Sequence, residues 1–396
     1  MPFYDPPGDG ISVCLNRWVV SWMLPFMKIL VSACACLLGW SGCLAAEVRL
    51  ERVPEKGLQP QVARGPDGTV HLVCLTGNPS ASEVLYRSRK VGGEWSSAVT
   101  VNHLPHTAVA MGTIRGSQIA VGPEGTVHVV WNGPGANGVP ASLFYTRLSC
   151  GAVDGFEPQR DLRGNTRALD GGASVATDAA GGVFILWHGS LPESPPGEDQ
   201  RRIFLARSVD QGRTFGAVEE VQAGVSGVCA CCSLKAFVAP SGEWLALYRA
   251  ARRVDQRDVT LLRSRDGGRT FESSTVGPWA LGACPMSSMA LAGSGAATRG
   301  VWEAEGLIAT ALFGSGTTPA PLTLGPGRHP ALAVNRRGET LVSWSEGTGW
   351  QRGGQLRWRL LDASGRPGEV TGSAPGMPAW GSSAVFVEGD DFVVLY

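Results

Sequence analysis

A two-strand unit recurs seven times along the chain, and this repeat restricts the fold more than any other feature. Each copy has an apolar stretch, a turn that contains glycine, and a second apolar stretch, as in Pro60–Val73 and Gln118–Trp131. The other copies are Ser174–Trp187, Lys235–Tyr248, Ser288–Trp302, Pro330–Trp344 and Ser382–Leu395. A repeat of this kind predicts one supersecondary unit per copy, each packed against its neighbours.

The spacing of the copies, about 40 to 60 residues, is typical of propeller blades with four antiparallel strands. A second hairpin lies between copies and is clearest at Ile203–Ser208 and Val259–Ser264. The 54 glycines and 26 prolines suit many short strands joined by tight turns. We therefore predict an all-β fold, a β-propeller with seven blades by repeat count. Because the last copy supplies only two strands, the stretch Val48–Val53 must complete its blade.

Two eight-residue turns follow the second hairpins with the same pattern. They are Ser-Val-Asp-Gln-Gly-Arg-Thr-Phe at 208–215 and Ser-Arg-Asp-Gly-Gly-Arg-Thr-Phe at 264–271. The pattern resembles the Asp-box of sialidases and related propellers, and sialidases have six blades, which is the alternative blade count. In such a turn the carboxylate accepts backbone N–H bonds and glycine supplies a positive φ, so the role is structural. The residues that define the two boxes are Ser208, Asp210, Gly212, Phe215, Ser264, Asp266, Gly268 and Phe271.

The sialidase resemblance implies a glycan at the mouth of the central channel and, for an enzyme, glycoside hydrolysis of the exo-sialidase type. That chemistry uses arginines for a carboxylate, a tyrosine activated by a glutamate, and an acid/base carboxyl group. The channel-facing candidates for catalysis are Tyr248, Arg249, Arg115, Arg328 and Glu303. The aromatic-Arg-Ile-Pro element of sialidases is missing; the nearest text is Glu51-Arg52-Val53-Pro54. Whether the chain is an enzyme therefore stays open at this point.

The cysteines form a second constellation. Cys229-Ala230-Cys231-Cys232 opens the fourth repeat and Cys284-Pro285-Met286 opens the fifth, so adjacent blades bring them to one side of the channel. This C-x-C-C and C-P-M pairing resembles a subgroup of exported bacterial sialidase-like propellers. Three interpretations remain open: disulfides, a soft-metal site for copper or zinc with Met286 as a further ligand, and redox-active thiols. Adjacent Cys231 and Cys232 could bind one ion only from an irregular loop.

The pattern of the amino-terminal residues is typical of a targeting segment. Met27 is a plausible start, followed by an apolar run from Ile29 to Trp40 and small residues up to Ala46. We expect residues 1–46 to be leader and signal, residues 47–396 to be a single propeller domain, and the mature chain to have no transmembrane helix. The expected location is periplasmic or secreted, with a lipoprotein anchored at Cys43 as the alternative.

Charge and repeat position narrow the remaining choices. The chain has 34 basic and 34 acidic residues, which gives no reason to expect a nucleic acid partner. His71 and His128 occupy equivalent strand positions in consecutive repeats, so they read as sheet residues and not as ligands. The leading hypothesis is an exported propeller that binds, and in an enzyme hydrolyses, a glycan. The alternatives are a non-enzymatic periplasmic protein with a cysteine-rich metal or redox site, and a protein-docking scaffold; the sequence leaves the oligomeric state open.

Overall fold

The computed structural model describes residues 46–112, 116–134, 141–152, 155–221, 227–295, 297–314 and 320–396. Residues 46–396 make up one compact unit. Its described residues form seven β-sheets and two single-turn 3-10 helices, η1 (Pro54–Lys56) and η2 (Glu198–Gln200). No helix in these ranges is long and apolar enough to cross a membrane. The predicted leader, with Met27 and Cys43, falls outside the described residues and stays a prediction.

Six of the sheets have four antiparallel strands that pair in chain order. The first three consist of β2 (Leu58–Arg64), β3 (Val70–Asn78), β4 (Ala81–Arg89) and β5 (Val99–Thr100); β6 (Gln118–Val121), β7 (Val127–Asn132), β8 (Leu143–Leu148) and β9 (Arg160–Asp161); and β10 (Ser174–Thr177), β11 (Val183–Gly189), β12 (Arg202–Ser208) and β13 (Glu219–Glu220). The next three consist of β14 (Lys235–Val238), β15 (Trp244–Arg249), β16 (Val259–Ser264) and β17 (Glu272–Gly277); β18 (Met289–Ser294), β19 (Ala297–Ala304), β20 (Leu307–Phe313) and β21 (Leu322–Pro326); and β22 (Arg328–Val334), β23 (Thr340–Glu346), β24 (Gly354–Leu361) and β25 (Pro367–Met377).

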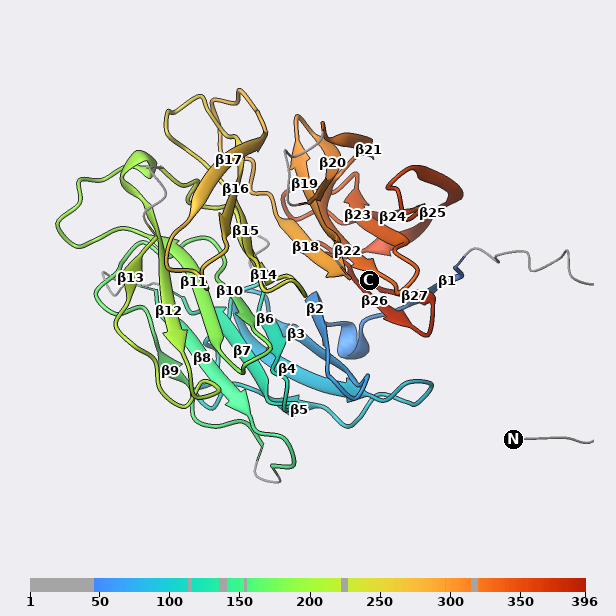
Figure 1. The fold of residues 1–396 in the computed structure, drawn as a ribbon, viewed down its shortest axis with the longest axis horizontal. Coiled ribbons are helices and arrows are strands. Elements are labelled where there is room, and N and C mark those ends of the chain that lie inside the picture. The colour runs from blue at the N-terminus through green and yellow to red at the C-terminus, as the bar shows by residue number, and fades with distance from the viewer. Residues whose placement is uncertain are drawn as a thin grey trace, which may run out of the picture. The chain divides into compact units, whose positions relative to one another are not determined.

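The seventh sheet closes the fold and joins the two ends of the unit. It contains β26 (Ala384–Glu388), β27 (Asp391–Leu395) and β1 (Val48–Glu51), and β1 pairs in parallel with β27 (Figure 1). The expectation that the strand near Val48 completes the last blade is confirmed. Parallel pairing at this one junction covers the edge that β27 would otherwise expose.

The first strands of the sheets follow one another around a ring. Contacts run from β2 to β6, β10, β14, β18, β22 and β26, and β26 contacts β2 again (Figure 1). The fold is therefore a propeller with seven blades, as the repeats predicted, and the alternative count of six is wrong. The first strands line a central channel.

The hydrophobic core lies between neighbouring blades. Every residue of the second strands β7, β11 and β15 is buried, since blades cover both faces of each strand. The indoles of Trp131, Trp187 and Trp302 are fully buried there. The outer strands β5, β9 and β13 have only two residues each.

The two Asp-box turns have matching hydrogen bonds. The backbone N–H of Thr214 donates to Asp210 Oδ1 at 2.9 Å, and that of Thr270 donates to Asp266 Oδ1 at 2.9 Å. The glycine two residues after each aspartate has a positive φ, 76° at Gly212 and 75° at Gly268. Each turn joins a third strand to a fourth strand, so it lies at the opposite end of the blade from the segment before the first strand.

Candidate functional site

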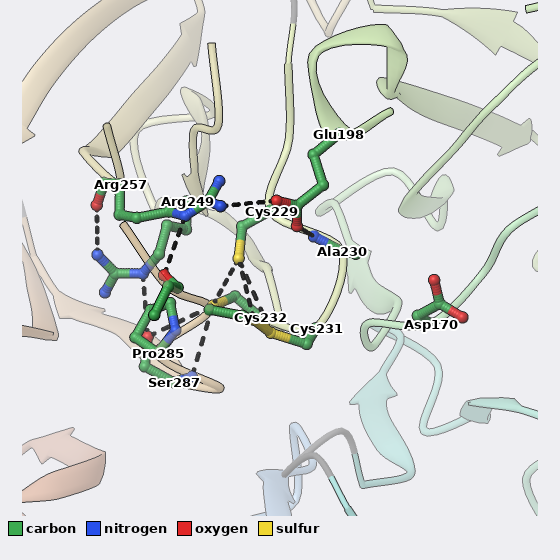
Figure 2. Close-up of a disulfide and its surroundings, with 12 residues drawn as sticks. Asp170, Glu198, Cys229, Ala230, Cys231, Cys232, Arg249, Arg257, Pro285 and Ser287 are labelled. Carbon is green, nitrogen blue, oxygen red and sulfur yellow. Dashed lines mark hydrogen bonds and ion pairs between the residues drawn. A yellow bond between two sulfur atoms is a disulfide. The ribbon is translucent and has the colours of Figure 1, made fainter. Parts of the chain in front are cut away.

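Four cysteines from two neighbouring blades converge next to the channel. Cys229, Cys231 and Cys232 lie in the segment between β13 and β14, and Cys284 lies between β17 and β18. All four sulfur atoms lie within 4.8 Å of one another, so they form one cysteine cluster (Figure 2). The Cys229 sulfur is 3.3 Å from that of Cys232, 3.5 Å from that of Cys284 and 3.9 Å from that of Cys231. The sulfurs of Cys231 and Cys284 are close enough to pair as a disulfide, drawn as such in Figure 2.

The segment that carries three of these cysteines is an irregular turn, fixed by hydrogen bonds from outside it. The Cys229 N–H donates to the carbonyl of Arg249 at 2.9 Å, and the Ala230 N–H donates to Glu198 Oε1 at 2.6 Å. The Ser233 N–H donates to the carbonyl of Ser287 at 3.1 Å, which ties the segment to the next blade. Since the turn lacks strand geometry, the adjacent Cys231 and Cys232 both contribute to one cluster.

Two buried arginines lie beside the cluster (Figure 2). Arg257 forms an ion pair with Glu198 Oε2 at 2.7 Å. Arg249 forms no ion pair with a carboxylate among the described residues; it donates to Ser287 Oγ at 3.0 Å and to the carbonyl of Arg257 at 2.6 Å. Its positive charge acts both on the Glu303 carboxyl group and on the Cys232 sulfur, where it stabilises negative charge.

The pKa values of the two buried free thiols, Cys229 and Cys232, are shifted in opposite directions. Burial raises the pKa of Cys232, but the hydrogen bond from Cys229, the charge of Arg249 and hydrogen bonds from Ser287 outweigh it, so the pKa is lowered. The pKa of Cys229 is raised, first by its hydrogen bond to Cys232 and then by burial. The Ser287 N–H lies 3.5 Å from the Cys232 sulfur as a donor. The cluster is thus suited to hold a thiolate at Cys232.

The structure buries three of the predicted catalytic residues, Tyr248, Arg249 and Glu303. Tyr248 is only 1% exposed and belongs to the core between blades. Burial raises its pKa to about 12, the opposite of what an activated nucleophile requires. Arg249, also 1% exposed, lies over the ring of Trp279 and donates to the carbonyl of Glu303 at 2.6 Å. Its donors are directed at protein atoms, and its role in substrate binding stays a prediction.

Glu303 and Arg328 do meet, between the fifth and sixth blades. Arg328 Nε is 3.4 Å from Glu303 Oε1, and Arg328 also donates to the carbonyl of Pro285. Glu303 is 2% exposed, and its Oε2 has no hydrogen-bond partner. Burial raises the pKa of Glu303 to about 7. The fifth catalytic candidate, Arg115, lies outside the described residues.

Met286, the predicted thioether ligand, is half-buried and has φ = 47°. Its role as a ligand stays a prediction. The sequence reasoning missed Ser287 and Lys235, which lie one and three residues from predicted site residues. A polar or charged side chain in a first strand was the available signal for Lys235, because first strands line the channel.

No protein-family model matches the sequence, and no curated protein matches it. Solved structures match its fold. A protein of unknown function from Dyadobacter fermentans has a TM-score of 0.52 and 15% identity over 83% of this chain and 97% of its own. An α-L-arabinanase of Penicillium chrysogenum, solved with arabinobiose, has a TM-score of 0.53 and 13% identity over 81% of this chain and 98% of its own.

A sialidase, Hadza microbial sialidase Hz136, also matches, with a TM-score of 0.48 and 14% identity over 79% of this chain and 70% of its own. The two TM-scores above 0.5 show a shared fold, and identities this low leave the activity to be argued from the site. With its two Asp-box turns and its ring of blades, the chain has a sialidase-like propeller fold.

Proposed function

We propose that the protein binds a soft metal ion, Zn²⁺ or Cu(I), at the cysteine cluster. The observation that carries the proposal is the convergence of four sulfurs within 4.8 Å. In a tetrahedral zinc site with Zn–S bonds of about 2.3 Å, neighbouring sulfurs lie about 3.8 Å apart. The distances from Cys229 to the other three sulfurs, 3.3 to 3.9 Å, lie around that value. The Cys231–Cys284 pair would have to open for an ion to enter.

Charge and burial support the same proposal. Thiolates, not thiols, bind metal, and Arg249 supplies a positive charge next to Cys232. Cys231 and Cys284 are half-buried whereas Cys229 and Cys232 are buried, so one side of the cluster is open to an incoming ion. Four thiolates in tetrahedral arrangement favour Zn²⁺, while two or three of them suit Cu(I).

We further propose that this function belongs to an exported, non-enzymatic protein. The basis is the apolar run from Ile29 to Trp40 with small residues before Ala46. Mass spectrometry of the protein from its native membrane and soluble fractions is expected to find a mature chain that starts after Ala45 or Ala46. Cleavage before Cys43 with a lipid on that cysteine would replace release by anchoring.

The metal proposal is tested on reduced protein purified without oxygen. Elemental analysis is expected to give about one zinc or copper per chain, with four protected thiols at the cluster. Titration with Co²⁺ should add sulfur-to-metal absorption in the near ultraviolet, and Zn²⁺ should remove it. The double variant Cys231→Ser with Cys284→Ser is expected to lose the band, whereas Cys150→Ser, an exposed cysteine far along the chain, should keep it.

A reduced protein that binds neither Co²⁺, Zn²⁺ nor Cu(I) above background would overturn the proposal. So would a Cys231–Cys284 disulfide that persists in protein kept reduced throughout purification. The free-thiol count of each preparation distinguishes these two results.

A second candidate, glycan binding at the channel mouth, is favoured by Trp350 and Glu303. Trp350 lies between β23 and β24, 60% exposed, and a Cβ added at Gly112 would lie 3.8 Å from its ring. An exposed indole beside a glycine is a platform on which a sugar ring can stack. A carboxyl group with a pKa raised to about 7, such as Glu303, suits a general acid for glycoside hydrolysis.

This candidate predicts retention of the protein on an immobilised glycan array, lost in Trp350→Ala. For hydrolysis, turnover of an aryl glycoside panel should disappear in Glu303→Gln and persist in Glu305→Gln, an exposed neighbour. Absence of both binding and turnover in the wild-type protein would eliminate it.

A further inference from the structure

Lys235 places a positive charge inside the central channel. It is the first residue of β14 in the fourth blade, and its ammonium group donates to Gln118 Oε1 at 2.9 Å. A longer contact of 3.4 Å reaches Gln61 Oε1. Since Gln61 and Gln118 belong to the first and second blades, the lysine side chain extends across the channel from one side to the other.

No described carboxylate neutralises the charge of Lys235. Among the described residues no carboxylate lies within ion-pair distance of its ammonium group, and its observed partners are amide oxygens. Burial lowers the pKa of Lys235 to about 8, so the ammonium group is still protonated in most molecules at pH 7. A confined cation without a counter-ion is costly unless a ligand or water compensates it.

The space around this ammonium group is large enough for a small organic molecule. The channel cavity has a volume of about 730 Å³, within the range of small-molecule sites. Near the mouth its wall carries the hydroxyls of Ser233, Ser288 and Ser382, and Ser382 Oγ is buried without a hydrogen-bond partner. The rest of the wall along the first strands is mostly alanine, valine and leucine.

The other cations of the wall are placed differently. Arg64 ends β2 and Arg336 follows the end of β22, so both lie at the end of the channel away from Ser233. Arg336 is paired with Asp390 at 2.6 Å. Among the described residues of the wall, Lys235 is therefore the one cation near the mouth, which matches one negative charge better than the two charges of a phosphate.

We propose that the central channel binds a small hydroxylated organic carboxylate, with Lys235 pairing with the carboxylate and the glutamine and serine side chains bonding to its hydroxyls. The site is separate from the cysteine cluster, whose residues do not line the cavity. Failure of the metal proposal therefore leaves this one intact.

Isothermal titration calorimetry with lactate and gluconate, against chloride and sulfate at matched ionic strength, tests the proposal. Lysine variants in the channel and on the outer surface provide the comparison: Lys235→Met removes the charge at nearly constant volume, and Lys56→Met does the same at an exposed position. We expect saturable binding of at least one of the two carboxylates, at least tenfold weaker in Lys235→Met and unchanged in Lys56→Met and in the variant that lacks Cys231 and Cys284.

Near-ultraviolet circular dichroism shows whether Lys235→Met keeps the native fold, and Lys235→Arg, which keeps the charge, should retain part of the affinity. The proposal is overturned if neither lactate nor gluconate binds the wild-type protein, or if folded Lys235→Met binds as tightly as wild type. Sulfate bound as tightly as the carboxylates would overturn the assignment of the ligand class.

Discussion

At the scale of single residues, the histidine–tyrosine pairs show how a repeat uses polar side chains in a core. His128 Nδ1 lies 2.8 Å from the Tyr145 hydroxyl, and His71 Nδ1 lies 2.7 Å from the Tyr86 hydroxyl in the preceding blade. A Cβ on Gly212 of the first Asp-box would collide with the Tyr145 hydroxyl. The box glycine thus meets two demands, a positive φ and close packing over the pair.

Replacement of His128 by glutamine is expected to make the free energy of unfolding depend less on pH below neutrality. Burial lowers the pKa of His128 to about 3, against about 6.5 in an unfolded chain. Above pH 6.5 the imidazole is neutral in both states; below it, the unfolded chain takes up the proton first. Between pH 7 and pH 5 the free energy of unfolding should therefore fall by about 2 kcal/mol less in His128→Gln than in wild type.

Urea unfolding at pH 7 and at pH 5 measures this difference. His106→Gln, at a histidine whose side chain is 68% exposed, serves as the matched control. Equal pH dependence in wild type and His128→Gln would contradict the argument that burial holds this imidazole neutral.

Single residues also mark the limit of the sequence reasoning. The equivalence of His71 and His128 could be predicted because the two copies of the repeat match closely around both histidines. The burial of Tyr248 was not, since an alternating strand pattern does not reveal which side chains a neighbouring blade covers. The hydrogen bond from Arg249 to the carbonyl of Glu303 depends on the distance between two blades, which spacing along the chain does not give.

At the scale of elements, the segments that lead into the first strands of five blades have a left-handed backbone conformation at the same relative position. In five blades a residue at or just before the first strand has a left-handed backbone: Gln59 (φ = 52°), Gly116 (52°), Met286 (47°), His329 (52°) and Trp380 (53°). Since the feature recurs, it belongs to the way the chain turns from an outer strand into the channel wall. The strain at Met286 is therefore not by itself a sign of a metal ligand.

Comparison of Met286→Gly with Met286→Ala tests this view. Both variants remove the thioether, but only glycine adopts φ = 47° without strain. We expect the glycine variant to be more stable by about 1 kcal/mol in urea unfolding of the metal-free, reduced protein.

The matched pair is Met289→Gly and Met289→Ala within β18, where the order should reverse because strand backbone disfavours glycine. An alanine variant at position 286 as stable as the glycine variant would show that the segment relaxes instead of holding the strained position.

The elements themselves were predictable to different degrees. First and second strands, such as β10 and β11 within Ser174–Trp187, follow from apolar residues that two blades bury. Fourth strands such as β13, with the exposed Glu219 and Glu220, lack that pattern because one edge and much of their surface face solvent. The cysteine cluster was predictable because repeat position alone places the starts of the fourth and fifth blades side by side.

At the scale of the whole molecule, closure of the ring depends on four residues at the start of the described chain. The strand β1 pairs with β27 in the register Val48 to Phe392 through Glu51 to Leu395. Arg89 of the first blade, 7% exposed, links it to the neighbouring strands: it forms ion pairs with Glu51 at 2.9 Å and with Glu388 at 3.5 Å. The last blade is thus closed by backbone hydrogen bonds between β1 and β27 and joined to the first blade by the ion pairs of Arg89.

Removal of β1 should open this junction. A chain that starts at Arg52 loses the parallel ladder and exposes the edge of β27, where Val393 and Val394 are fully buried in the intact ring. We expect its unfolding midpoint to fall by about 4 °C relative to a chain that starts at Ala46, as a loss of about 3 kcal/mol in a domain of this size implies. The uncovered edge should also cause association that increases with protein concentration.

Calorimetry and analytical ultracentrifugation of the two chains measure both effects. Arg89→Ala in the full ring separates the contribution of charge from that of the ladder, and it should lower the midpoint without causing association. If the chain that starts at Arg52 melts as the control does and stays monodisperse, then packing between the blades alone holds the ring closed. In that case β1 would pair with the seventh blade without contributing to the closure of the ring.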